Sequence, residues 1–82
     1  MTIAKVLWVD DEIDSMNSHV LFLRQKGYDV HTFTNGFDAI DYLSNNYADV
    51  VLLDESMPGI SGLQVLQQIK SINSNLPVVL IT

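Results

Sequence analysis

The chain has 82 residues, which is short against the roughly 100–200 residues of a typical domain, so it holds one domain at most. Its composition, 48% hydrophobic and 17% charged, is typical of a globular chain and excludes disorder. The net charge of −6 argues against nucleic acid as a partner and favours cations or basic surfaces, although acidity could also serve solubility alone. Without cysteines, a signal peptide or an apolar run of about 18 residues, the chain is expected to be cytoplasmic, with no membrane contact.

The first predicted elements are a buried strand and a helix. Residues 6–9 (VLWV) are continuously apolar, as in strands that are buried on both faces of a sheet. Apolar residues then recur at spacings of four and three, which predicts a helix that ends at Gly27, a residue favoured just after helix C-termini. These apolar residues are Met16, Val20 and Leu23.

An edge strand and a second helix are predicted next. Residues 29–34 mix apolar with polar side chains, as expected at the edge of a sheet. The Asn35-Gly36 pair predicts a turn, and a short helix follows it. The apolar positions of this helix are Ala39, Ile40 and Leu43.

The rest of the chain predicts a strand, a helix and a strand. Residues 50–53 and 78–81 are again continuously apolar, so both strands are expected to be buried on both faces. A third helix lies between them, with Ser61 as its N-cap. Its expected apolar positions are Leu63, Leu66 and Ile69.

This β-α-β-α-β-α-β order predicts a doubly wound α/β fold, in which helices cover both sides of a parallel sheet. The ligand site of such a sheet lies beyond the carboxyl ends of the strands, where the winding reverses. The first strand runs into Asp10, Asp11 and Glu12, and the third runs into Asp54. If these strands are neighbours, as in the order 2-1-3-4, at least three carboxylates crowd one crevice, those of Asp10, Asp11 and Asp54.

Crowded carboxylates are costly without a counter-charge. Two like charges about 5 Å apart repel by about 3 kcal/mol at an effective dielectric of about 20, so either a proton is retained or a cation is bound. Oxygen ligands with no His or Cys close by in sequence suit Mg²⁺ better than zinc, and phosphoryl chemistry uses such an ion. Each acidic segment alone could be a helix start or a turn; their pairing at two strand ends favours a metal site.

Three segments resemble the receiver domain of two-component response regulators. They are VLWVDDE (6–12), VLLDESMPG (51–59) and PVVLIT (77–82), and the resemblance extends over all 82 residues in order and spacing. It implies a flavodoxin-like fold with the strand order 2-1-3-4. More narrowly, LWVDDEID and DESMPGISG resemble the receivers of type IX secretion regulators.

The resemblance implies a phosphorylation switch rather than an enzyme, with a sensor histidine kinase or phosphotransfer protein as partner. At the matching positions, Asp54 takes the phosphoryl group and Asp11 binds Mg²⁺ directly, with Asp10 as its companion. Ser56 matches the position that binds the metal through its backbone carbonyl. Thr82 matches the switch hydroxyl, which turns toward the phosphoryl group. The domain would assist only its own phosphoryl transfer and hydrolysis, and it would control an output domain.

Receivers continue beyond the position of Thr82 with a fifth strand, two helices and a lysine that pairs with the phosphoryl group. No residue here matches that lysine, so residues 1–82 are expected to be an incomplete receiver, truncated after the fourth strand and without its C-terminal output domain. Strand 78–81 would then be an unprotected apolar edge, which predicts self-association through it.

Two other functions are compatible with the sequence. A receiver that docks partners without being phosphorylated is favoured by the missing lysine, but the presence of Asp10, Asp11, Asp54 and Thr82 argues against it. A Mg²⁺-dependent phosphotransferase or phosphatase of the dehalogenase type needs Asp-x-Asp after the first strand. This chain has Asp10-Asp11-Glu12 there instead, which disfavours that family.

Overall fold

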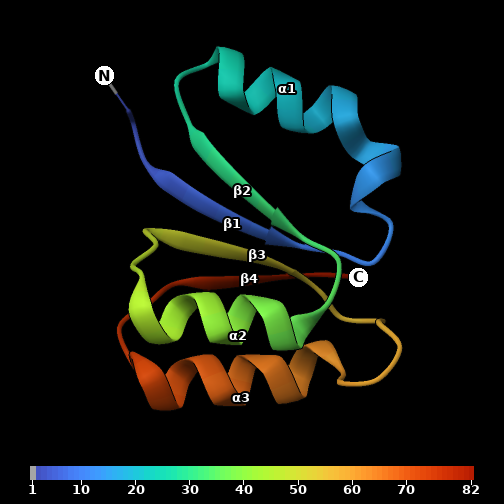
Figure 1. The fold of residues 1–82 in the computed structure, drawn as a ribbon, viewed down its shortest axis with the longest axis vertical. Helices are drawn as coiled ribbons and strands as arrows, with labels where there is room; N and C mark the ends of the chain where they lie inside the picture. Colours follow the sequence, from blue (N-terminus) through green and yellow to red (C-terminus); the bar gives the residue numbers. More distant parts are fainter. Residues whose placement is uncertain (1) are drawn as a thin grey trace.

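The chain folds around one parallel sheet of four strands (Figure 1). A computed structural model describes residues 2–82. The strands lie in the order β2-β1-β3-β4, which confirms the predicted doubly wound fold and its strand order. They are β1 (Lys5–Val9), β2 (Asp29–Phe33), β3 (Val50–Asp54) and β4 (Val78–Ile81).

The helices are divided unevenly between the two faces of the sheet. Helix α1 (Asn17–Gln25), preceded by the short 3-10 helix η1 (Ile13–Met16), lies on one face. Helices α2 (Gly36–Asn45) and α3 (Gly62–Ile72) lie side by side on the other (Figure 1). Within residues 2–82 no helix has the length and apolar character that crossing a membrane requires.

Strand β1 is buried on both of its faces, as its apolar run predicts. Leu7 and Val9 join the core under α2 and α3, whereas Val6 and Trp8 join the core under α1. Successive side chains of a strand point to opposite faces, so one short strand supplies both cores. This double burial agrees with the central position of β1 in the sheet, between β2 and β3.

The helix ends use the predicted capping residues. Gly27 has φ 103°, and the N–H groups of Gly27 and Tyr28 donate to the carbonyls of Arg24 and Leu23, which closes α1 in a Schellman motif. Ser61 caps α3 in a reciprocal capping box with Gln64.

The Asn35-Gly36 pair begins a helix rather than forming a separate turn. The Asn35 side chain accepts a hydrogen bond of 2.9 Å from the N–H of Asp38, and Gly36 is the first residue of α2. The predicted turn is therefore an N-cap, since an Asn side chain can satisfy either structure.

One predicted apolar position of α3 is wrong. Leu63 is 54% exposed, whereas Val65 is fully buried and shares the inner face of the helix with Ile69. Positions 65 and 69 are four apart and therefore stack on one side of a helix, while position 63 lies on the far side.

The expected double burial of β4 is also wrong. Val79, Leu80 and Ile81 are 50%, 36% and 37% exposed. Within residues 2–82, β4 is an edge strand that pairs with β3 alone, and no helix packs on its α1-side face.

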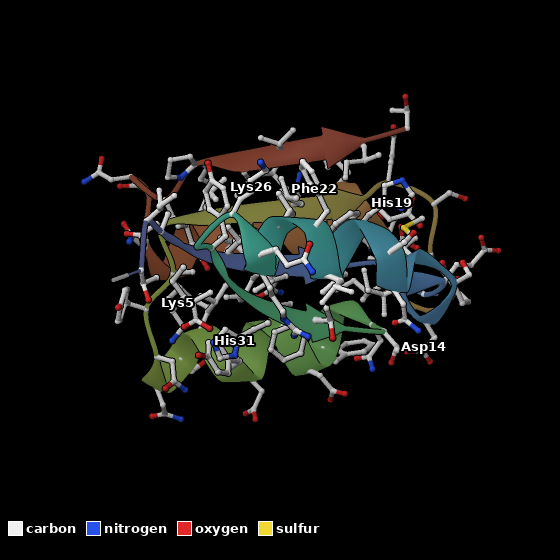
Figure 2. All side chains as sticks on the ribbon, turned by 90° about the horizontal axis from the view of Figure 1, so that it is seen from above. Lys5, Asp14, His19, Phe22, Lys26 and His31 are labelled. Atoms are coloured by element: carbon white, nitrogen blue, oxygen red, sulfur yellow. The ribbon has the colours of Figure 1, made fainter. Side chains whose placement is uncertain are left out.

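The uncovered area continues up to α1. Figure 2 shows Phe22 and His19 on the flank of α1 that faces β4, and Phe22 is 56% exposed. Together with Trp8 they line an open pocket of about 420 Å³. Trp8 belongs to the core, as predicted from its place in β1, but its Nε1 has no hydrogen-bond partner among the described residues. On this face the sheet is covered over β1 and β2 and bare over β4.

Candidate functional site

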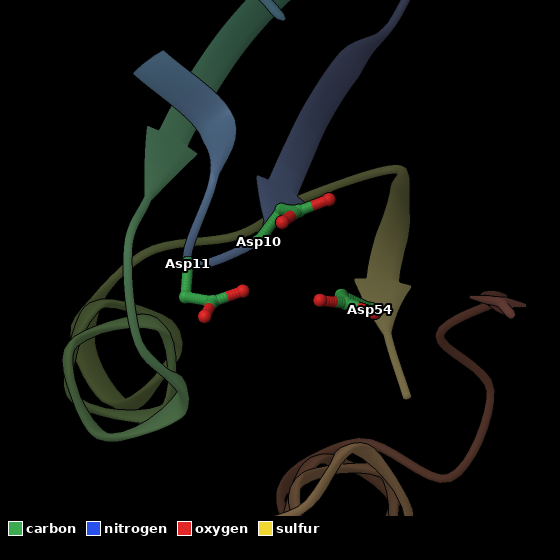
Figure 3. A group of neighbouring side chains, drawn as sticks. All are labelled: Asp10, Asp11 and Asp54. Carbon is green, nitrogen blue, oxygen red and sulfur yellow. The ribbon is translucent and has the colours of Figure 1, made fainter. Parts of the chain in front are cut away.

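Three carboxylates meet at the carboxyl ends of β1 and β3 (Figure 3). Asp10 and Asp11 directly follow β1, and Asp54 is the last residue of β3. Because these strands are neighbours in parallel register, their ends reach the same edge of the sheet. One carboxylate oxygen from each residue lies within 4.8 Å of the other two. The structure thus brings together the three acids that the sequence places at strand ends.

Backbone N–H groups orient two of these side chains. Asp10 is only 5% exposed, and its Oδ1 accepts a hydrogen bond of 2.9 Å from the N–H of Glu12. The N–H of Asp10 itself donates to the carbonyl of Phe33, which ties this residue to the end of β2. Asp54 is half-buried, and its Oδ1 accepts a hydrogen bond of 3.1 Å from the N–H of Ser56.

The surroundings of Asp10 favour its protonated form. Burial raises the pKa of Asp10 above its usual 3.8, and the negative charges of Asp54 and Asp11 raise it further against the opposing effect of the Glu12 N–H. In the described part of the chain, no lysine or arginine forms an ion pair with these acids. A cluster of hard oxygen donors that is buried at Asp10, half-buried at Asp54 and exposed at Asp11, with no such ion pair, fits a divalent cation such as Mg²⁺.

The loop after Asp54 is held against the first turn of α3. The N–H of Glu55 donates to the carbonyl of Ile81, and the N–H of Gly62 donates to the carbonyl of Glu55. A Cβ on Gly62 would lie 2.5 Å from the carbonyl oxygen of Asp54 and 2.6 Å from Cα of Glu55. Only glycine fits this close approach.

The structural role of Gly62 was missed by sequence reasoning, although the sequence carries a signal for it. A glycine next to the N-cap Ser61 lowers helix propensity, and such a residue often marks close packing.

The two remaining predicted site residues lie near the acids but outside their cluster. Ser56 is exposed, and its N–H contacts Asp54 as described above. Thr82 is exposed and directly follows Ile81, the residue of β4 that pairs with Asp54. Among residues 2–82, no hydrogen bond joins the Thr82 hydroxyl to the three acids.

Comparison with known families agrees with this geometry. The sequence model described as "Response regulator receiver domain" matches residues 6–82, a range that contains all three acids. The chain belongs to this receiver family. Receivers are the signalling domains of two-component systems. The receiver is 38% identical over 79 residues to the transcriptional regulatory protein CpxR homolog of Haemophilus influenzae. The aligned segment covers 96% of this chain but only 34% of that protein.

Solved receivers share the whole fold described here. The N-terminal domain of a response regulator receiver protein from Methanoculleus marisnigri JR1 is 29% identical, with a TM-score of 0.90 over 99% of this chain and 68% of that one. The response regulator TrrA of Thermotoga maritima, solved in complex with Mg²⁺-BeF, is 34% identical, with a TM-score of 0.85 over 98% of this chain and 68% of TrrA. TrrA in complex with the histidine kinase ThkA gives a TM-score of 0.87 over 100% of this receiver and 69% of that chain, again at 34% identity.

Asp10→Asn is expected to stabilise the metal-free receiver at neutral pH by about 1 kcal/mol or more. Like charges about 5 Å apart repel by about 3 kcal/mol at a dielectric of about 20, and exposure of Asp11 screens part of this. Because the pKa of Asp10 is raised on folding, the native state binds its proton more tightly, so stability falls as pH rises from 3.8 through the folded pKa. Urea unfolding in EDTA at pH 7 measures the gain.

The control for this prediction is Asp14→Asn, on the exposed side of η1 (Figure 2). It removes the same charge outside the cluster and should change stability by less than about 0.5 kcal/mol. A loss of stability in Asp10→Asn would show that the hydrogen bond from Glu12 outweighs the repulsion.

Proposed function

We propose that this chain is the phosphoacceptor receiver of a two-component response regulator, and that Asp54 accepts the phosphoryl group. The observation that carries this proposal is the cluster of Asp10, Asp11 and Asp54 within 4.8 Å, in a chain of the receiver family. Of the three, Asp54 is half-buried at the end of β3, so it is open to an incoming donor and still fixed by its strand.

Mg²⁺ is the proposed cofactor, held by Asp10, Asp11, Asp54 and the backbone carbonyl of Ser56. When bound, it offsets the carboxylate charge and the charge of the transferring phosphoryl group. The complex of TrrA with Mg²⁺-BeF, at 34% identity, supports this assignment.

In the transfer, a carboxylate oxygen of Asp54 forms a bond to phosphorus, and the bond between phosphorus and the donor breaks. The electron pair of the broken bond leaves with the imidazole nitrogen of a phosphohistidine, or with acetate when acetyl phosphate is the donor. The N–H of Ser56, which donates to Oδ1 of Asp54, holds the carboxylate in place. The hydroxyl of Thr82 then donates to a phosphoryl oxygen, a contact that exists only in the modified state and therefore shifts the conformational equilibrium.

The proposed partner is a sensor histidine kinase or a phosphotransfer protein, as the complex of TrrA with ThkA supports. A separate output domain and a cytoplasmic location follow from the same proposal. The domain would not turn over a substrate, beyond assisting its own phosphoryl transfer and hydrolysis. The narrower resemblance to type IX secretion regulators stays a prediction.

Intact-mass spectrometry tests the proposal. After incubation with acetyl phosphate, the chain should gain one phosphoryl adduct in Mg²⁺ and none in EDTA. A chain that binds Mg²⁺ by calorimetry but gains no adduct would contradict the acceptor role. It would favour a receiver that docks partners without being phosphorylated. A chain that is folded and binds no Mg²⁺ would contradict the metal site.

Self-association through β4 is a further expected result. Among residues 2–82 no strand pairs with the outer edge of β4, so its backbone N–H and C=O groups can pair with another chain, beside the exposed Val79 and Ile81. Sedimentation velocity should show dimers or larger species as concentration rises, and Val79→Lys should shift them toward monomer. Leu63→Lys, an equally exposed position on α3, should leave the distribution unchanged. A wild-type chain that stays monomeric at high concentration would refute the prediction.

A further inference from the structure

Gly36, the first residue of α2, faces both α3 and the loop after Asp54. A Cβ built on Gly36 would overlap Cγ2 of Val65 in α3 and would lie 3.0 Å from Cγ2 of Ile60 in the loop. Val65 is fully buried in the core, so it has no free space into which it can retreat.

The backbone does not explain this glycine. Among the described residues, only Gly27 and Gly59 have positive φ angles, so Gly36 adopts a conformation open to any residue. Glycine within a helix also costs up to about 1 kcal/mol relative to alanine. Glycine is therefore required at this position because a side chain would have no room between α2 and α3.

The contact continues from Val65 to the acceptor residue. The N–H of Val65 donates to the carbonyl of Ser61, so Val65 belongs to the first turn of α3. The same turn begins at Gly62, which packs on the backbone of Asp54 and Glu55 with no room for a Cβ. A displacement of this turn by α2 therefore reaches the backbone that carries the carboxylate.

We infer that Gly36 is a positioning residue for the phosphoacceptor loop: its missing side chain lets α2 seat the first turn of α3 so that Gly62 holds Asp54 and Glu55 in place. The inference rests on the proposed function only for the role given to Asp54. It assigns to the start of α2, a segment remote from the acids in sequence, control over the geometry of the metal site.

The test is a double-mutant cycle of Gly36→Ala, Val65→Ala and the two combined. The readouts are the amide chemical shifts of Glu55 and Ser56 without metal, the Mg²⁺ dissociation constant, and the urea midpoint. Gly36→Ala should move both amide resonances and weaken Mg²⁺ binding by about tenfold, the lower end of the effect of supporting residues on metal affinity. Val65→Ala removes the methyl group that the new Cβ overlaps, so the double variant should regain the wild-type shifts and affinity.

A separate control distinguishes positioning from loss of stability. Leu43→Ala removes buried volume from α2 without adding an atom against α3, so it should lower the urea midpoint and leave the shifts and the Mg²⁺ affinity near wild type. Should Gly36→Ala not fold, Val65→Ile enlarges the same contact from the α3 side and is read in the same way.

Two outcomes would overturn the inference. One is a folded Gly36→Ala with wild-type amide shifts and Mg²⁺ affinity. The other is a double variant as impaired as the single one. If the wild-type chain itself does not bind Mg²⁺, the proposed function fails, while the metal-free amide shifts still decide whether Gly36 positions the loop.

Discussion

Asp54→Asn is expected to abolish the phosphoryl adduct formed with acetyl phosphate and Mg²⁺, while the protein stays folded. The amide lacks the nucleophilic carboxylate oxygen, but it has the same shape and can still accept the hydrogen bond from the Ser56 N–H. Removing one charge from the cluster should also leave the metal-free protein at least as stable as the wild type. Intact-mass spectrometry and urea unfolding in EDTA measure the two effects on the same samples.

A matched control is Asp41→Asn, an exposed aspartate of α2 outside the cluster. This variant should gain the adduct to the wild-type extent, because the carboxylate of Asp41 lies on a helix, away from the other acids and from the strand ends. An adduct that persists in Asp54→Asn would place the acceptor elsewhere and would refute the proposed role. An Asp54→Asn protein that is clearly less stable in EDTA would contradict the electrostatic argument alone.

Leu53→Ala is expected to cost about 2–5 kcal/mol of unfolding free energy, the range found when a buried leucine leaves a cavity. Leu53 is fully buried under α2 and α3, next to Leu7 and Val9 of the neighbouring strand, and it directly precedes Asp54. At roughly 0.05–0.15 kcal/mol per residue, a domain of this length has about 4–12 kcal/mol of stability, so the loss is a large share of the total. Urea denaturation followed by circular dichroism measures it.

The corresponding control is Leu21→Ala on α1, where the same side chain is 56% exposed. It removes the same atoms with little change in buried area and should cost less than about 0.5 kcal/mol. Equal losses in the two variants would show that Leu53 is not packed in the core under α2 and α3.

Much of the fold could be predicted from local patterns. Three of the four strands are predictable from short apolar runs, and Gly27 and Ser61 mark helix ends because their capping chemistry is local. The acidic cluster was also predictable, since parallel neighbours bring the acids after their carboxyl ends to one edge of the sheet.

What could not be predicted depends on neighbours that are remote in sequence. Leu63 and Val65 are both apolar, and the packing of α3 against α2 and the sheet decides which of them is buried. The same holds for β4, whose apolar residues would be covered in a central strand and are exposed at an edge. The space available at Gly36 is likewise set by a contact with another helix, which no single segment reveals.

The pairing of β1 with β3 also bears on the order of folding. Val6 pairs with Val50 and Val9 with Leu53, so the whole segment that holds α1, β2 and α2 lies between the two paired strands. Closing so long a loop is entropically costly, and such pairings form late relative to local helices. Asp10 and Asp54 therefore meet only when this nonlocal step is finished, so a partly folded chain with its helices already formed has no assembled acceptor site. Assembly of the acid cluster then reports that β1 and β3 have paired.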